Sequence, residues 1–85
     1  MIPPDIRHAL NQHACRGGKT ARRRQVRRVE QFVRWCGCPP HQIGKKHVHL
    51  YFEEMSFTTT TARDHWYAIR LLWSLLGRSG LPPSP

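Results

Sequence analysis

The apolar residues of the chain recur every three or four positions, the spacing that places side chains on one face of an α-helix. This pattern predicts four helices and no strand, with the helices over residues 3–14, 20–36, 45–55 and 61–78. Residues that interrupt helices stand between them, namely Gly17-Gly18 after the first helix and Gly37 with Pro39-Pro40 after the second. We therefore expect an all-α protein, folded as a compact orthogonal bundle of four helices.

The second predicted helix has an apolar face and a basic face. Its apolar positions fall within an arc of about 120° on a helical projection, and they are Val26, Val29, Phe32, Val33 and Cys36. The opposite side carries Arg23, Arg27 and Arg34, with Arg24, Arg28 and Gln31 beside them. We expect the apolar face to pack in the core and the basic face to remain on the surface.

Four threonines, Thr58 to Thr61, mark the start of the fourth predicted helix. Thr61 and Asp64 match a capping box, in which the hydroxyl accepts from a backbone N–H and the carboxylate reaches back. The N-cap is therefore predicted at Thr61, with Thr58, Thr59 and Thr60 in the preceding loop. Apolar residues cover more than half of this helix, which indicates burial on several sides. The remaining polar stripe consists of Arg63, Tyr67, Arg70 and Ser74.

Glycine and proline bound the other elements. Gly44 is the predicted N-cap of the third helix, and Gly80 followed by Leu81 is the predicted stop of the fourth. Residues 1–19 are expected to form an N-terminal helix with a glycine linker, and residues 20–81 the main domain. Residues 82–85 read as a proline-rich tail with no means of packing.

The charge of the chain is concentrated in one segment. The 85 residues carry a formal charge of +9, and the segment from Arg16 to Arg34 alone carries +7, from eight basic residues and one acid, Glu30. Such a block indicates a polyanionic partner, either nucleic acid or an anionic membrane surface. No stretch approaches the roughly 20 apolar residues of a membrane span, and the N-terminus lacks the pattern of a signal peptide. We expect a soluble, cytoplasmic protein.

The three cysteines do not suggest a disulfide framework, because their number is odd and Cys36 and Cys38 are too close for an easy bridge. Cys36-x-Cys38-x-x-His41, with His47 and His49 further on, invites comparison with a zinc site. Paired zinc ligands usually have at least two residues between them, and Cys36 falls on the apolar face of the second helix. A core cysteine beside loop histidines is the favoured interpretation, and no metal or cofactor is expected.

The basic helix and the threonine run each admit a plain interpretation and a functional one. A run of charges is often only a solvated surface, but like charges at i, i+4 repel, and arginine suits phosphates and guanine edges. Contact with nucleic acid is therefore preferred for the six arginines between Arg22 and Arg34. The threonines are either a cap with a loop or a phosphate seat, because a helix start presents N–H groups beside the hydroxyls.

Three segments resemble the N-terminal, SAM-like core-binding domain of phage integrases and other tyrosine recombinases. "TARRRQVRRVEQFVRWCG" is similar to its capped helix with an aromatic-apolar end, and "QIGKKHVHLYFEEM" to its linker isoleucine and short helix. "TTTTARDHWYAIRLLWSLLGRSGL" is similar to its Ser/Thr-rich helix start, followed by an aromatic-leucine pattern and a glycine. The resemblance covers about three-quarters of the chain, from Thr20 to Leu81. It implies a SAM-like fold for residues 20–81, acting as one half of a clamp around duplex DNA.

The resemblance and the charge pattern together predict DNA contacts from the second helix and from the start and polar stripe of the fourth. The predicted contact residues are Lys19, Thr20, Arg22, Arg23, Arg24, Arg27, Arg28, Arg34, Thr58, Thr59, Thr60, Arg63, Tyr67 and Arg70. The implied function is double-stranded DNA binding in DNA integration or site-specific recombination, at the nucleoid. A recombinase catalytic domain and other recombinase protomers are further implied partners, and the isolated domain is expected to be a monomer.

Catalysis in the resembled family belongs to a separate C-terminal domain with an Arg, His-x-x-Arg and Tyr constellation. This chain ends before such a domain, and Tyr51 and Tyr67 lie inside predicted helices and do not match the nucleophile. The chain alone is therefore not expected to be an enzyme, but either a fragment of an integrase or a stand-alone, non-catalytic relative. The alternative is a small regulatory or adaptor protein of a mobile element that binds a protein or RNA partner with the same fold.

Overall fold

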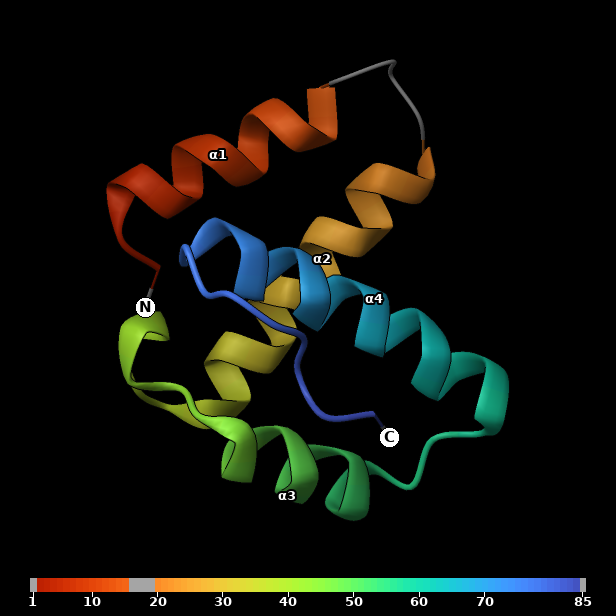
Figure 1. Ribbon diagram of the computed structural model, residues 1–85. Helices are drawn as coiled ribbons and strands as arrows, with labels where there is room; N and C mark the ends of the chain where they lie inside the picture. The colour runs from red at the N-terminus through yellow and green to blue at the C-terminus, as the bar shows by residue number, and fades with distance from the viewer. Residues whose placement is uncertain (1, 16–19, 85) are drawn as a thin grey trace.

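The computed structural model describes residues 2–15 and 20–84 of the chain. These residues form four α-helices and one 3-10 turn, which are α1 (Pro4–Cys15), α2 (Thr20–Cys36), η2 (Pro40–Gln42), α3 (Lys45–Met55) and α4 (Thr59–Leu75) (Figure 1). Within those two ranges no strand is present, so the all-α prediction is confirmed. None of these helices is long and apolar enough to cross a membrane. The predicted Gly17-Gly18 linker lies outside the described residues.

The helices cross one another rather than lying parallel. In Figure 1, α4 passes in front of α2, while α1 and α3 lie at opposite ends of the molecule. The most extensive helix contact is between α2 and α4, and α1 and α3 each pack on α2. The radius of gyration is 12.1 Å, close to the ~12 Å expected of a compact domain of this length.

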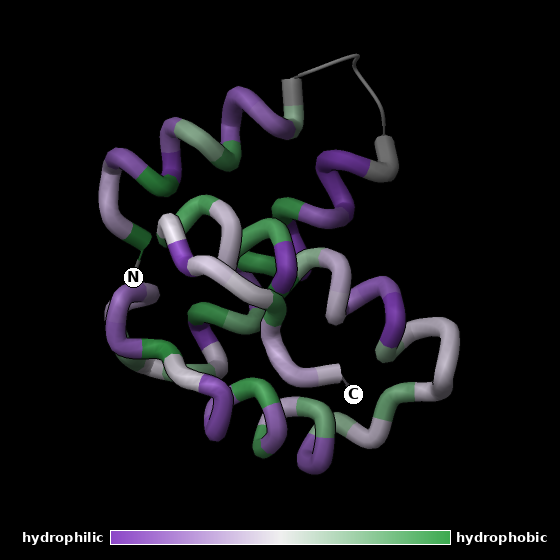
Figure 2. Tube along the Cα trace, viewed as in Figure 1, coloured by the Kyte–Doolittle hydropathy of each residue, from purple (hydrophilic) through white to green (hydrophobic). Residues whose placement is uncertain are grey.

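The core is built from one face of each helix. The predicted apolar face of α2 is buried at Val26, Val29, Phe32 and Val33. Figure 2 shows hydrophilic residues at the start of α2 and hydrophobic residues first appearing toward its crossing with α4. The other buried apolar side chains are Ile6 and Leu10 of α1, Ile43, Val48 and Tyr51 around α3, and Ala68, Ile69, Leu72 and Trp73 of α4. The first helix therefore shares one core with the segment 20–81.

Tyr51 stands at the centre of an aromatic cluster. Its ring makes edge-on contacts with Phe32, Trp35 and Phe57 at centroid distances of 4.9, 5.2 and 5.7 Å. Such T-shaped pairs add about 0.5–1.5 kcal/mol each beyond the area they bury. Burial, with Cys36 nearby, raises the pKa of Tyr51 to about 12, so the hydroxyl stays neutral.

His65 completes this cluster from α4. Its ring stacks on Phe57, with centroids 4.2 Å apart and planes 15° apart. Its Nδ1 lies 3.3 Å from the Tyr51 hydroxyl, within hydrogen-bond distance. Burial lowers the pKa of His65, and the positive charge of Arg28 adds to this, while Asp64 opposes it. The role of His65, which the sequence left open, is that of a neutral core residue.

The fourth helix begins earlier than predicted, so the prediction of Thr61 as N-cap is wrong. Thr58 is the N-cap, with extended backbone (φ −63°, ψ 161°). Its hydroxyl accepts from the N–H of Thr61 at 3.4 Å, and Thr59 and Thr60 belong to the first turn. The register is explained by Phe57 and Ala62, at N′ and N4 of a hydrophobic staple, which line the same hollow.

The fourth helix also ends earlier than predicted, at Leu75 instead of near residue 78. Gly77, with φ +75°, is the residue in left-handed conformation after the helix. Its N–H donates to Ser74, and the N–H of Arg78 donates to Trp73, which is the bond pattern of a Schellman motif. The prediction of Gly80 as the stop is therefore wrong.

Arg78 fastens this helix end to the η2 turn. Its guanidinium carbon lies 4.4 Å from the centroid of the Trp73 ring. The same group donates to the backbone carbonyl of His41 at 3.2 Å. In a Schellman motif the residue at this place usually makes an apolar contact with the helix, and here a cation–π contact replaces it.

Pro82 and Pro83 pack on α4, so the expectation of a tail without packing is wrong. Pro82 is buried. The indole N–H of Trp66 donates to the carbonyls of Pro82 and Pro83, at 3.3 and 3.0 Å. Proline has no N–H of its own, but its carbonyl is an acceptor like any other.

Candidate nucleic-acid interface

The polar stripe of α4 lies on the surface, as the sequence predicts. Arg63, Tyr67, Arg70 and Ser74 are all exposed. Tyr67 stands out among them, because 44% of this large aromatic side chain is accessible. It is held edge-on against Trp66, with ring centroids 5.4 Å apart and planes at 66°.

Hollows on both sides of Tyr67 lie between α4 and the start of α2 and between α4 and the C-terminal segment. One hollow of about 240 Å³ is lined by Arg22, Gln25, Arg28, Asp64 and Tyr67. A second of about 240 Å³ continues along α4 and is lined by His13, Gln25, Tyr67, Arg70, Leu71 and Ser74. A third of about 280 Å³ lies toward the start of α4, lined by Thr59, Arg63, Trp66, Tyr67 and Ser84. Tyr67 lines all three, and we refer to them together as the Tyr67 groove.

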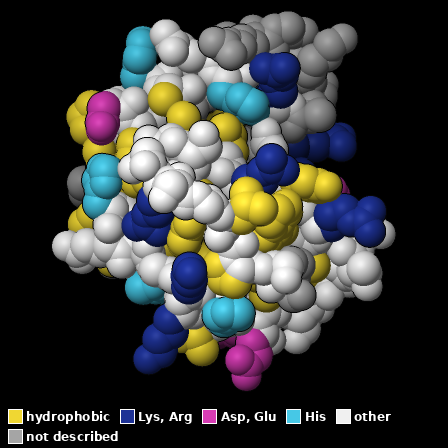
Figure 3. Space-filling model, viewed as in Figure 1, with side chains coloured by type: hydrophobic (Ala, Val, Ile, Leu, Met, Phe, Trp, Pro, Cys, Tyr) yellow, Lys and Arg dark blue, Asp and Glu magenta, His cyan; other side chains and the backbone are white. Residues whose placement is uncertain are grey.

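The Tyr67 groove is rich in arginine. Arg22 and Arg28 of α2 and Arg63 and Arg70 of α4 border it. Figure 3 shows this face, with Lys and Arg side chains around hydrophobic side chains over the middle of α4. Arginine in a partly enclosed groove attracts phosphate groups more strongly than on a flat surface, because low-dielectric walls focus the field. The groove is therefore the most suitable seat for a polyanion on this face.

Asp64 is the acid that lines the groove, and it lies opposite Arg28 with a closest N–O distance of 3.9 Å. Both side chains are partly exposed, so the pair contributes at most about 1 kcal/mol. Its effect is on position: it keeps the Arg28 guanidinium against α4, between the two helices. The sequence predicts that Asp64 belongs to the capping box of α4. That prediction is wrong, because the helix begins at Thr59.

The other predicted arginines of α2 lie on a different surface. Arg23, Arg27 and Arg34, which we term the outer arginine row, are exposed. On a helical projection they lie about 120° around α2 from Arg28. Arg34 borders a hollow with Arg7 and Glu30, on the side of α2 that faces α1. The sequence places all of these arginines on one basic helix, but the structure divides them between two surfaces.

Glu30, the acid of the basic segment, pairs with Arg7 of α1. The Arg7 guanidinium nitrogen lies 2.9 Å from the Glu30 carboxylate. This pair joins α1 to α2 beside the outer arginine row. Because the Glu30 carboxylate is paired with Arg7, it offsets less of the positive charge of that row. Arg24, which is also exposed, lies between the outer arginine row and Arg28 on the helical projection.

The threonines of the fourth helix lie on the surface beside the Tyr67 groove. Thr58, Thr59 and Thr60 are exposed, and Thr59 lines the groove hollow that also contains Arg63. A capped helix start carries the positive end of the helix dipole, which favours an anion nearby. The structure therefore brings Thr59 together with Arg63 and Tyr67 of the polar stripe.

Two predicted contact residues cannot be placed. Lys19 lies outside the described residues, and of Thr20 only the backbone position, at the start of α2, is described.

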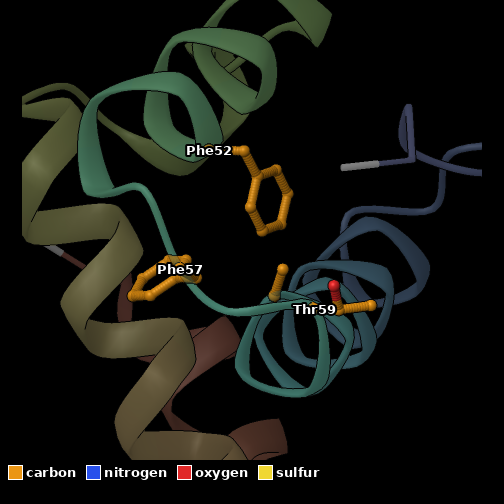
Figure 4. Close-up of a pocket in the computed structure, with 4 residues that line it drawn as sticks. Phe52, Phe57 and Thr59 are labelled. Atoms are coloured by element: carbon orange, nitrogen blue, oxygen red, sulfur yellow. The ribbon is translucent and has the colours of Figure 1, made fainter.

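Another hollow lies at the start of α4, beside two phenylalanine rings. It measures about 270 Å³ and is lined by Phe52, Phe57, Thr59 and Ala62. In Figure 4 the Phe52 side chain points from α3 toward the first turn of α4, where Thr59 lies. This hollow carries no charged lining residue and is unlike the Tyr67 groove.

The cysteines and histidines near the end of α2 do not converge. Among residues 2–15 and 20–84, no group of three or more His, Cys, Asp or Glu side chains could hold a metal ion. His47 uses both ring nitrogens: Nδ1 accepts from the Gly44 N–H at 3.0 Å, and Nε2 lies 3.9 Å from the Cys38 sulfur. Burial and the nearby Cys38 raise the pKa of Cys36 to about 12, so its thiol stays protonated. The two contacts of His47 lie at the start of α3, where Gly44 is the N-cap, as predicted.

The sequence does not single out Gln25 and His13, which also line the groove. The Oε1 of Gln25 accepts a hydrogen bond from Nε2 of the His13 ring at 2.7 Å, so α1 contributes to this surface. On the helical projection Gln25 lies about 60° from Arg28, so the sequence could have predicted that Gln25 borders the same surface. The approach of α1 has no such signal, because it depends on tertiary packing.

Comparison of the chain with protein-family models, with curated protein sequences and with solved structures finds no significant match.

Proposed function

We propose that this protein binds double-stranded DNA through α2 and α4. The observation that carries the proposal is the Tyr67 groove, where arginines from two helices surround an exposed aromatic ring beside the start of α4. Arg22, Arg28, Arg63 and Arg70 would contact phosphates, with Thr58, Thr59 and Thr60 as hydroxyl donors next to them. Binding would be weak and largely independent of sequence, since most of this contact is to the DNA backbone.

The outer arginine row supplies a second contact or a steering field. Its three arginines lie about 120° around α2 from Arg28, so one duplex would have to bend around the exposed side of α2 to contact both surfaces. A field from several uncompensated charges also raises the rate of encounter with DNA. In either case its removal weakens binding without changing the groove.

The biological context of the proposal is DNA integration or site-specific recombination. It rests on the resemblance of residues 20–81 to the SAM-like core-binding domain of tyrosine recombinases. The observed order of four helices, a short α3 and a threonine-rich start of α4 is compatible with that architecture. In this proposal the chain grips DNA and does no chemistry itself, and recombinase protomers or a catalytic domain would act with it at the nucleoid.

The direct test compares two double variants that each remove two positive charges. Duplex affinity is measured by fluorescence anisotropy between about 50 and 200 mM salt. Arg22→Ala/Arg28→Ala should weaken binding and lower the log–log salt slope by about two units, one for each lost phosphate contact. The control is Lys45→Ala/Lys46→Ala, which removes two exposed charges at the start of α3. Circular dichroism checks that both variants fold.

The outcome distinguishes a located site from general charge. A larger loss in the arginine pair than in the lysine pair supports the groove as the DNA seat. Equal losses would mean that only net charge matters, and an affinity independent of salt would refute electrostatic DNA binding altogether.

One observation favours the alternative of an adaptor that binds a protein partner. The hollow of Phe52, Phe57, Thr59 and Ala62 is open at the surface, and Leu50 of α3 is 46% exposed. Under this alternative the basic residues only steer the partner. RNA of the same length, used in the same anisotropy assay, tests the other partner class.

A further inference from the structure

Tyr67 is placed where a flat ligand could lie on its ring. The residue is 44% exposed and borders three hollows, so a ligand in any of them can reach its ring. The edge-on contact with Trp66 fixes the ring from one side. A tyrosine held in this way presents its aromatic surface with little loss of conformational freedom on binding.

The hollows beside Tyr67 are also lined by arginines from both helices. Arg22 and Arg28 lie on one side of the ring and Arg63 and Arg70 on the same helix as the ring itself, one turn before and one turn after it. Each hollow is smaller than the roughly 300–1,000 Å³ of a site that encloses a whole small molecule. The groove is therefore suited to one flat group at a time, with the rest of the ligand extending along the surface.

A paired duplex offers no free base face to such a ring, because each face is covered by the neighbouring base pair. An unpaired or extruded base does offer one, and stacking on an aromatic side chain is how single strands are held by a wide range of proteins. Trp66 is less suited to this role, because it is only partly exposed and the guanidinium of Arg70 lies over its ring, 5.9 Å from the centroid.

We propose that Tyr67 is a stacking platform for an unpaired nucleobase, so that the preferred ligand of the groove is DNA with a single-stranded or unstacked nucleotide. The proposal rests on the proposed function, since the same arginines would hold the flanking phosphates. The arginines account for affinity to any DNA strand, and Tyr67 adds a preference for an exposed base. Base identity would matter little, because every base has a face.

The experiment uses 2-aminopurine, whose fluorescence falls when it stacks on an aromatic ring, placed in a single strand, in a bulge and in a fully paired duplex. Four proteins are compared: the unaltered chain, Tyr67→Phe, Tyr67→Leu and Leu50→Ala. Leu50→Ala is the matched control, because Leu50 is exposed to a similar degree on α3. Circular dichroism checks the fold of each.

We expect the unaltered chain and Tyr67→Phe to quench the fluorescence of 2-aminopurine in the single strand and in the bulge. Tyr67→Leu should not quench it. Tyr67→Leu should lose roughly 5- to 150-fold in affinity for the single strand, the range reported for one stacked base. Its affinity for the paired duplex should change much less, and Leu50→Ala should behave as the unaltered chain.

Two results would overturn the proposal while leaving duplex binding in place. One is equal quenching by Tyr67→Leu and the unaltered chain, and the other is the same affinity loss for single strand and duplex. Failure of the unaltered chain to bind any of the three DNAs would instead refute the proposed function itself.

Discussion

At the residue scale, Thr58 determines where α4 begins. Four threonines in a row are chemically equivalent as caps, so composition alone cannot choose among them. Phe57 decides, because its ring is stacked on His65 and holds the residue after it at the edge of the core. A bulky apolar residue directly before the first threonine is a signal that the sequence contains, and a staple pattern would have found it.

Thr58→Ala should lower the free energy of unfolding by about 0.5–1 kcal/mol, the lower part of the usual range for a cap, because its hydrogen bond is long. The measurement is urea denaturation followed by circular dichroism. Thr60→Ala is the control, since Thr60 is exposed within the first turn and should change stability less. A larger loss at Thr60 than at Thr58 would contradict this assignment of the cap.

His65 makes the stability of the fold depend on pH. Its pKa in the folded state is lowered, mainly by burial and then by Arg28, with Asp64 acting in the opposite direction. The unfolded chain therefore binds a proton more readily than the folded one below the usual histidine pKa of about 6.5. The stabilising contribution of neutral His65 is complete above that pH and is lost as the pH falls toward the lowered value.

His65→Phe should remove this part of the pH dependence. Phenylalanine can still stack on Phe57 but cannot bind a proton. Between about pH 7 and 5, above the range in which ordinary carboxyl groups titrate, the free energy of unfolding should fall less in the variant than in the unaltered chain. Parallel curves for the two proteins would show that His65 does not couple folding to protons.

At the element scale, α2 carries its core face and its charged surfaces independently. The core residues Val26, Val29 and Val33 are buried, while the outer arginine row of Arg23, Arg27 and Arg34 is exposed on another side. The helical projection predicts both facts from the sequence. It could not predict which charged side would face α4, since that depends on how two helices distant in the sequence cross.

Replacing Arg23, Arg27 and Arg34 with alanine should leave the helical circular dichroism intact, because none of the three is buried. Alanine is also the better helix former and removes like-charge repulsion. Duplex DNA affinity should fall, and each lost phosphate contact should lower the salt slope by about one unit. Loss of helicity would instead assign these arginines to the fold, and full affinity would restrict DNA contact to the Tyr67 groove.

The two ends of α4 show why helix boundaries are harder to predict than helix faces. The apolar pattern runs on through Leu76, and glycine follows at both 77 and 80. The choice of Gly77 depends on Arg78, whose guanidinium lies over Trp73 and reaches the carbonyl of His41. Such a contact joins residues 37 positions apart, and the local sequence holds no trace of it.

At the scale of the whole molecule, the last residues of the chain belong to the folded domain. Composition indicates an unstructured tail, because prolines cannot extend a helix or a sheet ladder. The structure shows Pro82 buried, with two carbonyls near it bonded to the Trp66 indole. Proline lacks an N–H donor, but its carbonyl oxygen still accepts a hydrogen bond, so a proline-rich segment can be fixed to a helix by a donor such as the indole N–H.

Trp66→Phe should lower the melting temperature by roughly 4–8 °C, which corresponds to about 1 kcal/mol in a domain of this size. The change keeps an aromatic ring but removes the indole N–H that holds the tail. Trp35→Phe is the matched control, since its indole N–H donates to the exposed carboxylate of Glu54, where water can take its place. Melting is followed by circular dichroism, and an equal or larger effect in Trp35→Phe would argue against the tail as a structural element.

The pairing of α2 with α4 also sets an order on folding. These two helices make the most extensive contact in the molecule, although the whole of α3 lies between them along the chain. Contacts between distant segments form late, because loop closure must precede them. During synthesis we therefore expect the first three helices to emerge with Phe32 and Tyr51 incompletely covered, and the core to close once Ile69 and Leu72 have left the ribosome. In that interval the nascent chain should be accessible to chaperones and proteases, so slower synthesis of α4 should lengthen its exposure.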